Sequence, residues 1–369
     1  MRNLIDSAAK RLAWAALLPM LLTGCSGGGD TDTGGGAGGD TTVDAGPAPL
    51  QGDLESWTWA PVDGAFCADG NPTGLAVNLT NRSPNAVIFL MGGGACWDYE
   101  SCYGAHSKAF YVSRGFGESD MPFLSVFTGA MGLLSRDDPQ NPFRDYSVVS
   151  IPYCTGDAFT GNNTAEYQGK RTMHVGHANI MAYLPRIVAT FPNAQRIILV
   201  GASAGGVGVA YNWWHVQQAF GKIRVDMIDD SGDVVPAPYL KPSLLQTWQD
   251  AWHLEDGLPP GCTECKTALD ALISWSAAQM PNSRGALLAF TQDNVFPGFL
   301  SITGGEFTMG LDALASQRLD DLPRFRYFFA DQSGHGLMAH PDLTQNDVRL
   351  WDWLPQMVND DPEWADVHP

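Results

Sequence analysis

The sequence is short of basic side chains. Its 369 residues include 21 lysines and arginines against 40 aspartates and glutamates, so the formal net charge is −19 at pH 7. Nucleic acids and anionic membrane surfaces bind to basic surfaces, and we therefore expect neither as a partner. The charge does not restrict the fold, and the chain is long enough to bury a large core.

No apolar run reaches the length of about 20 residues that a membrane-spanning helix needs. The run at residues 12–24 follows a basic start and has the length of a signal-peptide core, so residues 1–24 are expected to be removed after export. Its end, LTGC, resembles the lipobox of bacterial lipoproteins, in which the cysteine, here Cys25, is lipidated. Residues 25–46 are rich in glycine and read as a flexible linker, and the folded domain covers residues 47–369.

These features predict a lipoprotein at the bacterial outer membrane or the cell surface. The protein would be attached to the membrane only through the lipid on Cys25. We also expect it to be a monomer. Ser26 rather than an aspartate follows the cysteine, which by resemblance to Gram-negative lipoproteins favours the outer membrane. An ordinary secretory signal that happens to contain a cysteine is the alternative.

Cysteine is scarce: apart from Cys25 in the lipobox, the sequence contains six cysteines. An even number of cysteines in an exported protein indicates disulfides. The spacings favour these pairs: Cys96 with Cys102, Cys262 with Cys265, and Cys67 with the remaining Cys154. The segment GCTEC also resembles half of a zinc site, but the nearest histidine, His253, is alone, and we expect no metal.

Short β-rich apolar runs alternate with helical patterns along the domain. Alternation of this kind predicts an α/β protein with a mainly parallel sheet covered on both faces, and here the α/β-hydrolase fold. The helical patterns include residues 172–191 and 206–220, and a tryptophan-containing insertion at about 239–284 is expected to form a small cap. The predicted strands are residues 85–94, 145–154, 195–203, 223–232, 285–293 and 324–335.

One serine stands among small residues directly after an apolar run. The segment GASAG, residues 201–205, fits the pattern G-x-S-x-G between a predicted strand and a helix-compatible segment. A nucleophile elbow requires this context, because strand and helix approach closely where the serine turns the chain. The same pattern at residues 24–28 lies in the lipobox and lacks that context. Ser203 is therefore the predicted nucleophile.

A serine nucleophile needs a base, and the base needs an acid that orients it. In the α/β-hydrolase order the acid and then the histidine follow the serine. His335 comes directly after the last predicted strand and is the predicted base, with His340 as the fallback. Asp293 ends the preceding strand and is the predicted acid, with Asp229 or Asp230, which end the strand after the serine, as the alternative.

A glycine run, Gly92 to Gly94, follows the first predicted strand. It resembles the HGGG-type loop that supplies a backbone N–H to an oxyanion, and the residue after the nucleophile supplies another. Gly93, Gly94 and Ala204 are therefore the predicted oxyanion hole. The run carries neither G-K-[ST] nor a G-x-G-x-x-G that opens a helix, so a nucleotide site is disfavoured and no cofactor is expected.

Six segments combine into a more specific signal. They are CADGNPTGLAVNL (67–79), LMGGGACWD (90–98), IPYCTGDAF (151–159), YQGKRTM (167–173), GASAGG (201–206) and IDDSGD (228–233), together spanning about half of the mature domain. With them the chain resembles the pectin acetylesterase and Notum family of serine carboxylester hydrolases, whose members hydrolyse O-acyl esters. The resemblance implies Ser203 as nucleophile, Gly92 to Gly94 as oxyanion loop, and Trp97 at the mouth of the pocket.

The predicted function is the removal of short acyl groups, most simply acetyl, from an O-acylated carbohydrate. Pectin is a polyanion that an acidic domain repels unless basic side chains gather at the cleft. Candidates for this role are Lys108, Arg114, Lys170 and Arg171. A polyester depolymerase or lipase on the same fold is one alternative, supported by the aromatic cap. A surface-tethered glycan-binding protein without catalysis is the other.

Overall fold

The computed structural model describes residues 47–123, 132 and 135–369. The predicted signal peptide, the lipidation site Cys25 and the linker lie outside these residues. Among the helices within them, none is both long enough and apolar enough to cross a membrane.

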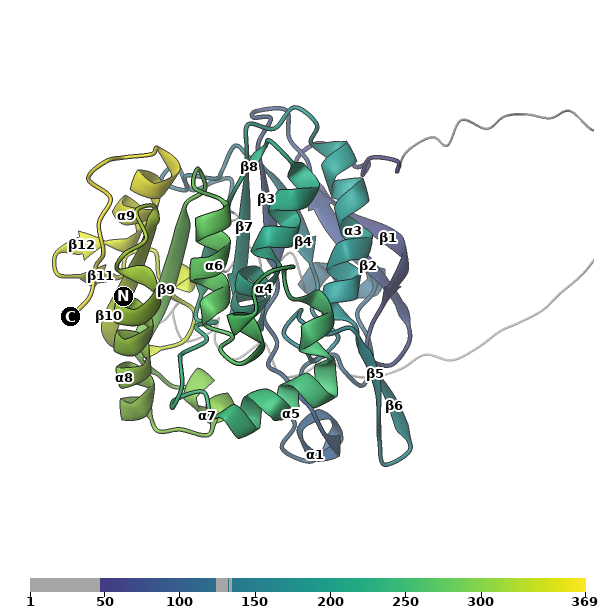
Figure 1. The fold of residues 1–369 in the computed structure, drawn as a ribbon. Helices are drawn as coiled ribbons and strands as arrows, with labels where there is room; N and C mark the ends of the chain where they lie inside the picture. Colours follow the sequence, from purple (N-terminus) through teal and green to yellow (C-terminus); the bar gives the residue numbers. More distant parts are fainter. Residues whose placement is uncertain (1–46, 124–131, 133–134) are drawn as a thin grey trace, which may run out of the picture. The chain divides into compact units, whose positions relative to one another are not determined.

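Eight strands within the described residues form one twisted sheet in the order β1-β2-β4-β3-β7-β8-β9-β10 (Figure 1). From β4 to β10 all neighbours are parallel, whereas β1 and β2 are antiparallel additions at one edge. This is an α/β-hydrolase fold, as predicted. The strands are β1 (Trp57–Phe66), β2 (Pro72–Asn78), β3 (Ala86–Leu90), β4 (Ser147–Ile151), β7 (Arg196–Ala202), β8 (Arg224–Asp230), β9 (Gly285–Asp293) and β10 (Phe325–Gly334).

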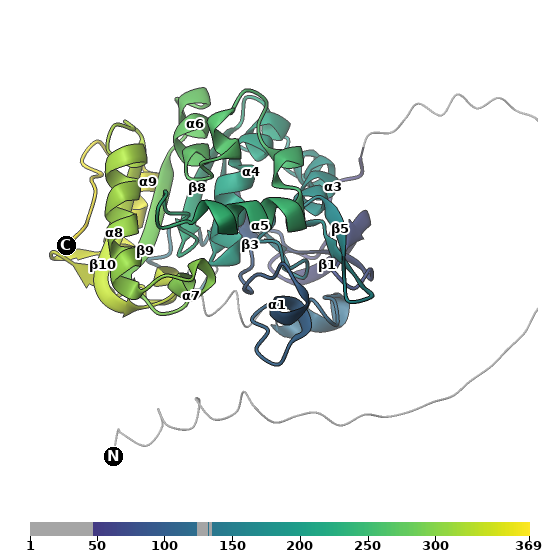
Figure 2. The ribbon, with the colours of Figure 1, turned by 60° about the horizontal axis from the view of Figure 1, so that its bottom comes forward.

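Helices cover both faces of the sheet. Trp213 of α4 meets Phe325 of β10, and Phe328, three positions along the strand and so on the other face, meets Trp353 of α9. The helices α3, α4 and α6 lie side by side on the α4 face (Figures 1 and 2). The helices are α1 (Tyr99–Tyr103), α3 (Gly176–Thr190), α4 (Ala204–Phe220), α5 (Pro242–Trp252), α6 (Ala271–Gln279), α7 (Phe296–Leu300), α8 (Gly304–Leu314) and α9 (Leu350–Val358).

The six predicted strands are confirmed as β3, β4, β7, β8, β9 and β10. Residues of β3 and β4 are buried throughout, as expected of strands that are covered on both faces. Strand and helix do not alternate throughout, however. The strands β1 and β2 precede the alternating part, and the start of the predicted helix 172–191 belongs to a hairpin of β5 (Asn163–Tyr167) and β6 (Lys170–His174). Gln168 and Gly169 form its two-residue turn with φ values of 52° and 81°, which favours a hairpin over a helix.

The segment expected to form a cap, residues 239–284, divides between two locations. Helix α5 lies along the edge where the parallel strands end, next to α7 and α1 (Figure 2). Helix α6 packs against α4 on the face of the sheet, as an ordinary crossover helix does. Only the first part of this segment therefore lies near the carboxyl ends of the strands, where α/β proteins place their sites.

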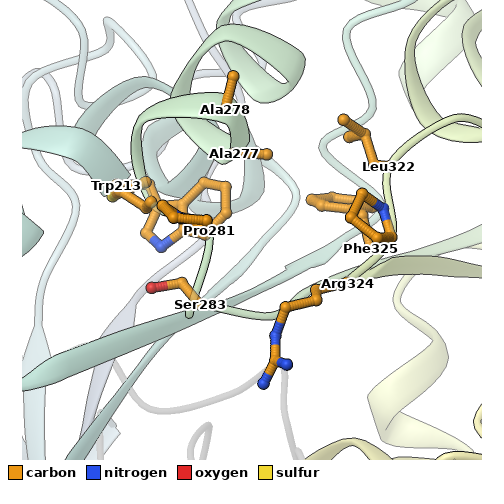
Figure 3. Close-up of a pocket in the computed structure, with 10 residues that line it drawn as sticks. Trp213, Ala277, Ala278, Pro281, Ser283, Leu322, Arg324 and Phe325 are labelled. Atoms are coloured by element: carbon orange, nitrogen blue, oxygen red, sulfur yellow. The ribbon is translucent and has the colours of Figure 1, made fainter.

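A cavity of about 220 Å³ lies at the opposite edge, between Trp213, Met280 and Phe325 (Figure 3). Its other lining includes Ser283, two residues before β9, and Arg324, directly before β10. The cavity is therefore at the amino ends of the strands, away from the predicted catalytic residues.

The three predicted disulfides are present. They join Cys67 to Cys154, Cys96 to Cys102 and Cys262 to Cys265. The first connects the end of β1 to the loop after β4 and closes 87 residues of chain, whereas the last closes only 3.

Loop length predicts unequal contributions of these disulfides to stability. Changing both Cys67 and Cys154 to alanine should lower the free energy of unfolding by about 4 to 5 kcal/mol, because a long loop loses the most entropy on closure. The matched pair of changes at Cys262 and Cys265 should cost about 1.5 kcal/mol. Urea unfolding followed by tryptophan fluorescence measures both. Equal losses would contradict the assignment of the first disulfide as the main covalent constraint.

Candidate active site

Ser203 sits on a tight turn between β7 and α4. Its backbone has φ 56° and ψ −119°, a strained conformation for a residue with a side chain. A Cβ on Gly201 would lie 2.0 Å from the carbonyl oxygen of Gly205, so strand and helix meet where only glycine fits. The side chain of Ser203 is half-buried at the carboxyl end of the sheet. This is the geometry of a nucleophile elbow.

His335 and Asp293 form a hydrogen-bonded pair at the same edge. The His335 Nδ1–Asp293 Oδ2 distance is 2.7 Å, and 19% of the histidine side chain and 1% of the aspartate side chain are exposed. Asp293 Oδ1 also accepts the N–H groups of Val295 and Phe296, each at 2.7 Å. With Nδ1 donating to the carboxylate, the lone pair of Nε2 is free to accept a proton.

The register of the sheet explains why these two residues meet. Strands β9 and β10 are parallel, and Gly334 pairs with Asp293, so His335 follows one residue beyond that pair. His340 is exposed and packs against the ring of Phe290, with ring centroids 5.8 Å apart. The structure thus brings His335, rather than the fallback His340, to the predicted acid.

The alternative acids are engaged elsewhere. Asp230 accepts the backbone N–H groups of Leu337 and Met338, and Asp229 accepts the N–H of Gly232 at 2.9 Å. Both lie at the end of β8, which pairs with β7 on one side and β9 on the other. The contacts of Asp230 with the loop after His335 were not predicted from the sequence. The sequence feature that pointed to such contacts was the position of IDDSGD (228–233) at the end of the strand that follows Ser203 in the chain.

The glycine loop after β3 runs against Ser203, the predicted nucleophile. A Cβ on Gly92 would lie 2.7 Å from the carbonyl oxygen of Ala202 and 3.2 Å from Ser203 Cβ. Ala204 is the first residue of α4, and N–H groups of a first helical turn have no partner within the helix. Gly93, Gly94 and Ala204 therefore lie on the two backbone segments that flank Ser203. Backbone N–H groups in such a position can stabilise an oxyanion.

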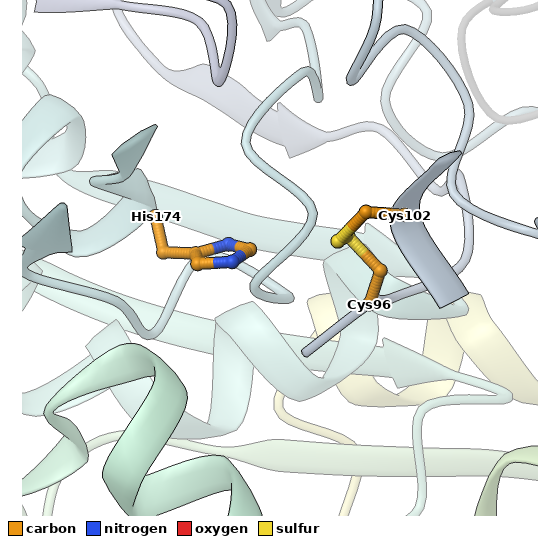
Figure 4. A group of neighbouring side chains, drawn as sticks. All are labelled: Cys96, Cys102 and His174. Carbon is orange, nitrogen blue, oxygen red and sulfur yellow. A yellow bond between two sulfur atoms is a disulfide. The ribbon is translucent and has the colours of Figure 1, made fainter. Parts of the chain in front are cut away.

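The disulfide Cys96–Cys102 braces the far end of the glycine loop. The N–H of Cys96 donates to the Gly156 carbonyl, and Trp252 Nε1 donates to the Cys96 carbonyl, both at 2.8 Å. His174 lies beside the two sulfurs (Figure 4). Because the sulfurs are bonded to each other, they are not thiolate ligands. Both nitrogens of His174 form hydrogen bonds, Nδ1 with the Thr155 carbonyl oxygen at 2.8 Å and Nε2 with Tyr167 Oη at 3.0 Å. This group therefore forms a packing contact and not a metal centre.

Two aromatic residues, Trp97 and Phe110, lie on segments connected to the glycine loop. Trp97 packs against Trp248 and Trp252 of α5, with centroid distances of 6.0 and 6.3 Å. Phe110, with 65% of its surface exposed, donates its backbone N–H to the carbonyl of Gly93 in the glycine loop at 2.9 Å. Sequence reasoning missed Phe110, because nothing in its local pattern shows that its loop returns to the glycine loop.

Three further buried aspartates lie close to the pair, and burial raises the pKa of each. The pKa of Asp229 is raised to about 8 and that of Asp230 to about 6. The pKa of Asp233 is also raised, by burial and then by the neighbouring carboxyls, and within the described residues its carboxyl oxygens have no hydrogen-bond partner. Asp229 is therefore mostly neutral at pH 7 and burial favours the neutral form of Asp233, whereas Asp230 is mostly ionised at that pH.

The chain is similar in sequence to known esterases. A family model described as Pectinacetylesterase matches residues 53–268, more than half of the chain. Pectin acetylesterase 4 of Arabidopsis thaliana is 34% identical over 149 residues, which cover 39% of this chain and 34% of that protein. Palmitoleoyl-protein carboxylesterase NOTUM of Homo sapiens is 28% identical over 173 residues, which cover 45% of this chain and 34% of that protein. Each match therefore spans about a third of the curated relative.

A solved structure supports the fold over a larger part of the chain. The Wnt deacylase Notum from Drosophila, in its crystal form II, superimposes with a TM-score of 0.62 at 18% sequence identity. The superposition covers 83% of this chain and 93% of that one. The shared fold thus extends well beyond the segment matched by sequence.

The elbow and the His335–Asp293 pair predict an activated serine hydroxyl. A fluorophosphonate probe should label the protein at Ser203, because the base can remove the hydroxyl proton as phosphorus is attacked. Labelling should disappear in Ser203→Ala and fall at least about 100-fold in rate in His335→Ala. His340→Ala is the control and should react as the unmodified protein does. Loss of labelling in His340→Ala with retention in His335→Ala would show that the base is misassigned.

Proposed function

The chain belongs to the pectinacetylesterase family, and we propose that it is a serine carboxylester hydrolase with Ser203, His335 and Asp293 as its triad. The observation that carries this proposal is the 2.7 Å contact between His335 Nδ1 and Asp293 Oδ2 at the edge where Ser203 stands on its elbow. The names of two relatives, an acetylesterase and a palmitoleoyl-protein carboxylesterase, describe ester hydrolysis with different acyl groups.

The proposed reaction proceeds through an acyl-enzyme. Ser203 Oγ attacks the ester carbonyl while His335 Nε2 takes its proton, and the imidazolium is held and stabilised by Asp293. N–H groups of Ala204 and of the Gly93–Gly94 segment stabilise the oxyanion. His335 then protonates the leaving alcohol. In the second half, His335 removes a proton from water, which attacks the acyl-enzyme and releases the acid.

We propose a short acyl group because the glycine loop is tightly packed. A Cβ on Gly94 would lie 1.9 Å from the Lys108 carbonyl oxygen and 3.3 Å from the ring of Phe299. Trp97 is turned toward the tryptophans of α5. Side chains thus border the oxyanion loop closely, which favours acetyl or butyryl groups over long acyl chains.

An O-acylated carbohydrate is the proposed natural substrate. Of the four basic candidates, Lys108 lies against the glycine loop, with its ammonium 5.5 Å from the centroid of the Phe299 ring. Arg114 pairs with Asp120 at 2.8 Å, and Lys170 lies 4.3 Å from the centre of a tyrosine ring. Lys108 is therefore the cation best placed to reduce the repulsion between this acidic protein and an acidic sugar chain.

The alternatives keep specific support. Exposed Phe110 beside the oxyanion loop would suit a lipase-like or polyester-cleaving enzyme. The tryptophans near the site would suit a non-catalytic glycan-binding protein, although the assembled His335–Asp293 pair favours catalysis.

The proposal also includes export, lipidation of Cys25, attachment to an outer membrane and a monomeric state. They depend on the sequence of residues 1–46.

A chain-length series tests the acyl preference. We expect kcat/KM for p-nitrophenyl acetate or butyrate to exceed that for the octanoate or palmitate by at least about 10-fold, because an excluded acyl chain costs more than the roughly 1.4 kcal/mol that this factor represents. Ser203→Ala serves as the blank for spontaneous hydrolysis. A higher kcat/KM on octanoate or palmitate would replace the short-acyl proposal with the lipase-like alternative.

Asp293 and Asp229 offer a matched pair of changes for the acid. Asp293→Asn should lower kcat by about 10⁴-fold, because an amide cannot hold the histidine in the required tautomer or stabilise the imidazolium. Asp229→Asn should change kcat little, since burial raises the pKa of this carboxyl to about 8 and it is already neutral at pH 7. Steady-state rates at pH 7 measure both. Equal losses would mean that the triad acid is not assigned to the right strand.

A further inference from the structure

Asp230 contacts the backbone of both the nucleophile turn and the base loop. Its carbonyl oxygen accepts the N–H of Ser203 at 2.7 Å. Its carboxylate oxygens accept the N–H of Leu337 at 2.7 Å and the N–H of Met338 at 3.1 Å. These two N–H groups follow His335 by two and three residues. One fully buried residue therefore connects the two segments that must cooperate in proton transfer.

Ser231 extends the same contact by one residue. Its Oγ accepts the N–H of Gly336 at 2.9 Å and donates to Asp230 Oδ1 at 3.1 Å. Its backbone φ is 62°, a left-handed conformation that is strained for a residue with a side chain. Three successive N–H groups after His335 are thus held by two adjacent side chains at the end of β8. Such a row of N–H groups favours a negative charge.

We propose that Asp230 is a positioning residue of the esterase: its carboxylate holds the loop that carries His335 and adds a second negative charge beside the imidazolium that forms during turnover. This inference rests on the proposed function. It assigns to Asp230 a role separate from that of Asp293, which contacts the imidazole directly.

The charges around His335 support the electrostatic part of the proposal. Asp293 of β9 contacts the ring, and Asp230 of β8 lies behind the loop. Burial raises the pKa of Asp229 to about 8 and also raises the pKa of Asp233, which favours the neutral form of both carboxyls. The pKa of Asp230 is raised to about 6, so this carboxyl is mostly ionised at pH 7. His340 faces Phe290 on the other side of the loop. Asp230 is therefore the second negative group facing the base.

The hydrogen bonds explain why an aspartate suits this position. Leu337 and Met338 donate to different carboxylate oxygens. An asparagine has one acceptor oxygen, and its NH₂ group would face the remaining N–H donor. Asp230→Asn therefore removes both the charge and one loop contact, while Ser231→Ala removes a loop contact and leaves the charge.

The test compares these two variants by rate and by pH profile, using p-nitrophenyl acetate. For Asp230→Asn we expect kcat to fall about 10- to 100-fold with KM changed less than about threefold, because the base is misplaced while the substrate site is intact. The acid limb of its kcat/KM profile should move down by about 0.5 pH unit, since an imidazolium beside one fewer negative charge releases its proton more readily. Ser231→Ala should lower kcat at least about threefold without moving the limb.

Asp226→Asn is the matched control, because Asp226 is a buried aspartate at the other end of β8 that pairs with Arg196 and Arg224. It should lower the unfolding temperature and leave the pH profile unchanged. A folded Asp230→Asn enzyme with an unmoved acid limb overturns the proposal. If Asp230→Asn does not fold, a Ser231→Ala enzyme with wild-type kcat overturns it. Failure of the unmodified protein to react with a fluorophosphonate would instead refute the proposed function itself.

Discussion

The close approach of β7 and α4 at Ser203 is the constraint on which the rest of the site depends. A Cβ on Gly201 would lie 2.0 Å from the Gly205 carbonyl oxygen, so the chain can reverse there only without side chains on either side. Ser203 takes the strained φ of 56° as a result, and its side chain stands at the end of the strand instead of within the core. The glycine loop after β3 can then run against it, because Gly92 also lacks a side chain where it meets Ala202 and Ser203.

The parallel strands bring the other side chains of the site to the same edge of the sheet, because their carboxyl ends meet there. The ends of β8, β9 and β10 lie next to β7 in that order, so Asp230, Asp293 and His335 follow one another across the sheet. Residues that are 42 positions apart in the chain, Asp293 and His335, come within 2.7 Å because the pairing of β9 with β10 continues to Gly334. Two further contacts hold the loops: the disulfide Cys96–Cys102 at the glycine loop, and the carboxylate of Asp230, at the end of β8, at the loop after His335.

The net charge of −19 gives no indication of how charge is arranged along the sheet. At the amino ends of the strands, arginines gather around two acidic side chains: Arg196 and Arg224 pair with both Asp226 and Asp360, and Arg284 pairs with Asp360. Buried aspartates lie at the carboxyl ends, where burial raises the pKa of Asp229 to about 8 and also raises the pKa of Asp233, which favours their neutral forms. This arrangement limits the buried negative charge near the base to the two carboxylates that contact His335 or its loop.

Local sequence patterns were sufficient to identify the six parallel strands of the sheet and the elbow serine, because these depend on residues close together in the chain. Apolar runs identify β3 and β7, and small residues around Ser203 report a turn that larger side chains cannot make. Strand order also suggested Asp293 and His335 as partners but left Asp229 and Asp230 open for the acid. Three contacts are visible in the tertiary structure alone. They are the hydrogen bond between His335 and Asp293, the hydrogen bonds from the N–H groups after His335 to Asp230, and the hydrogen bond from Phe110 to the glycine loop. Those contacts join residues distant in the chain, and their geometry depends on sheet register and loop paths that local patterns do not encode.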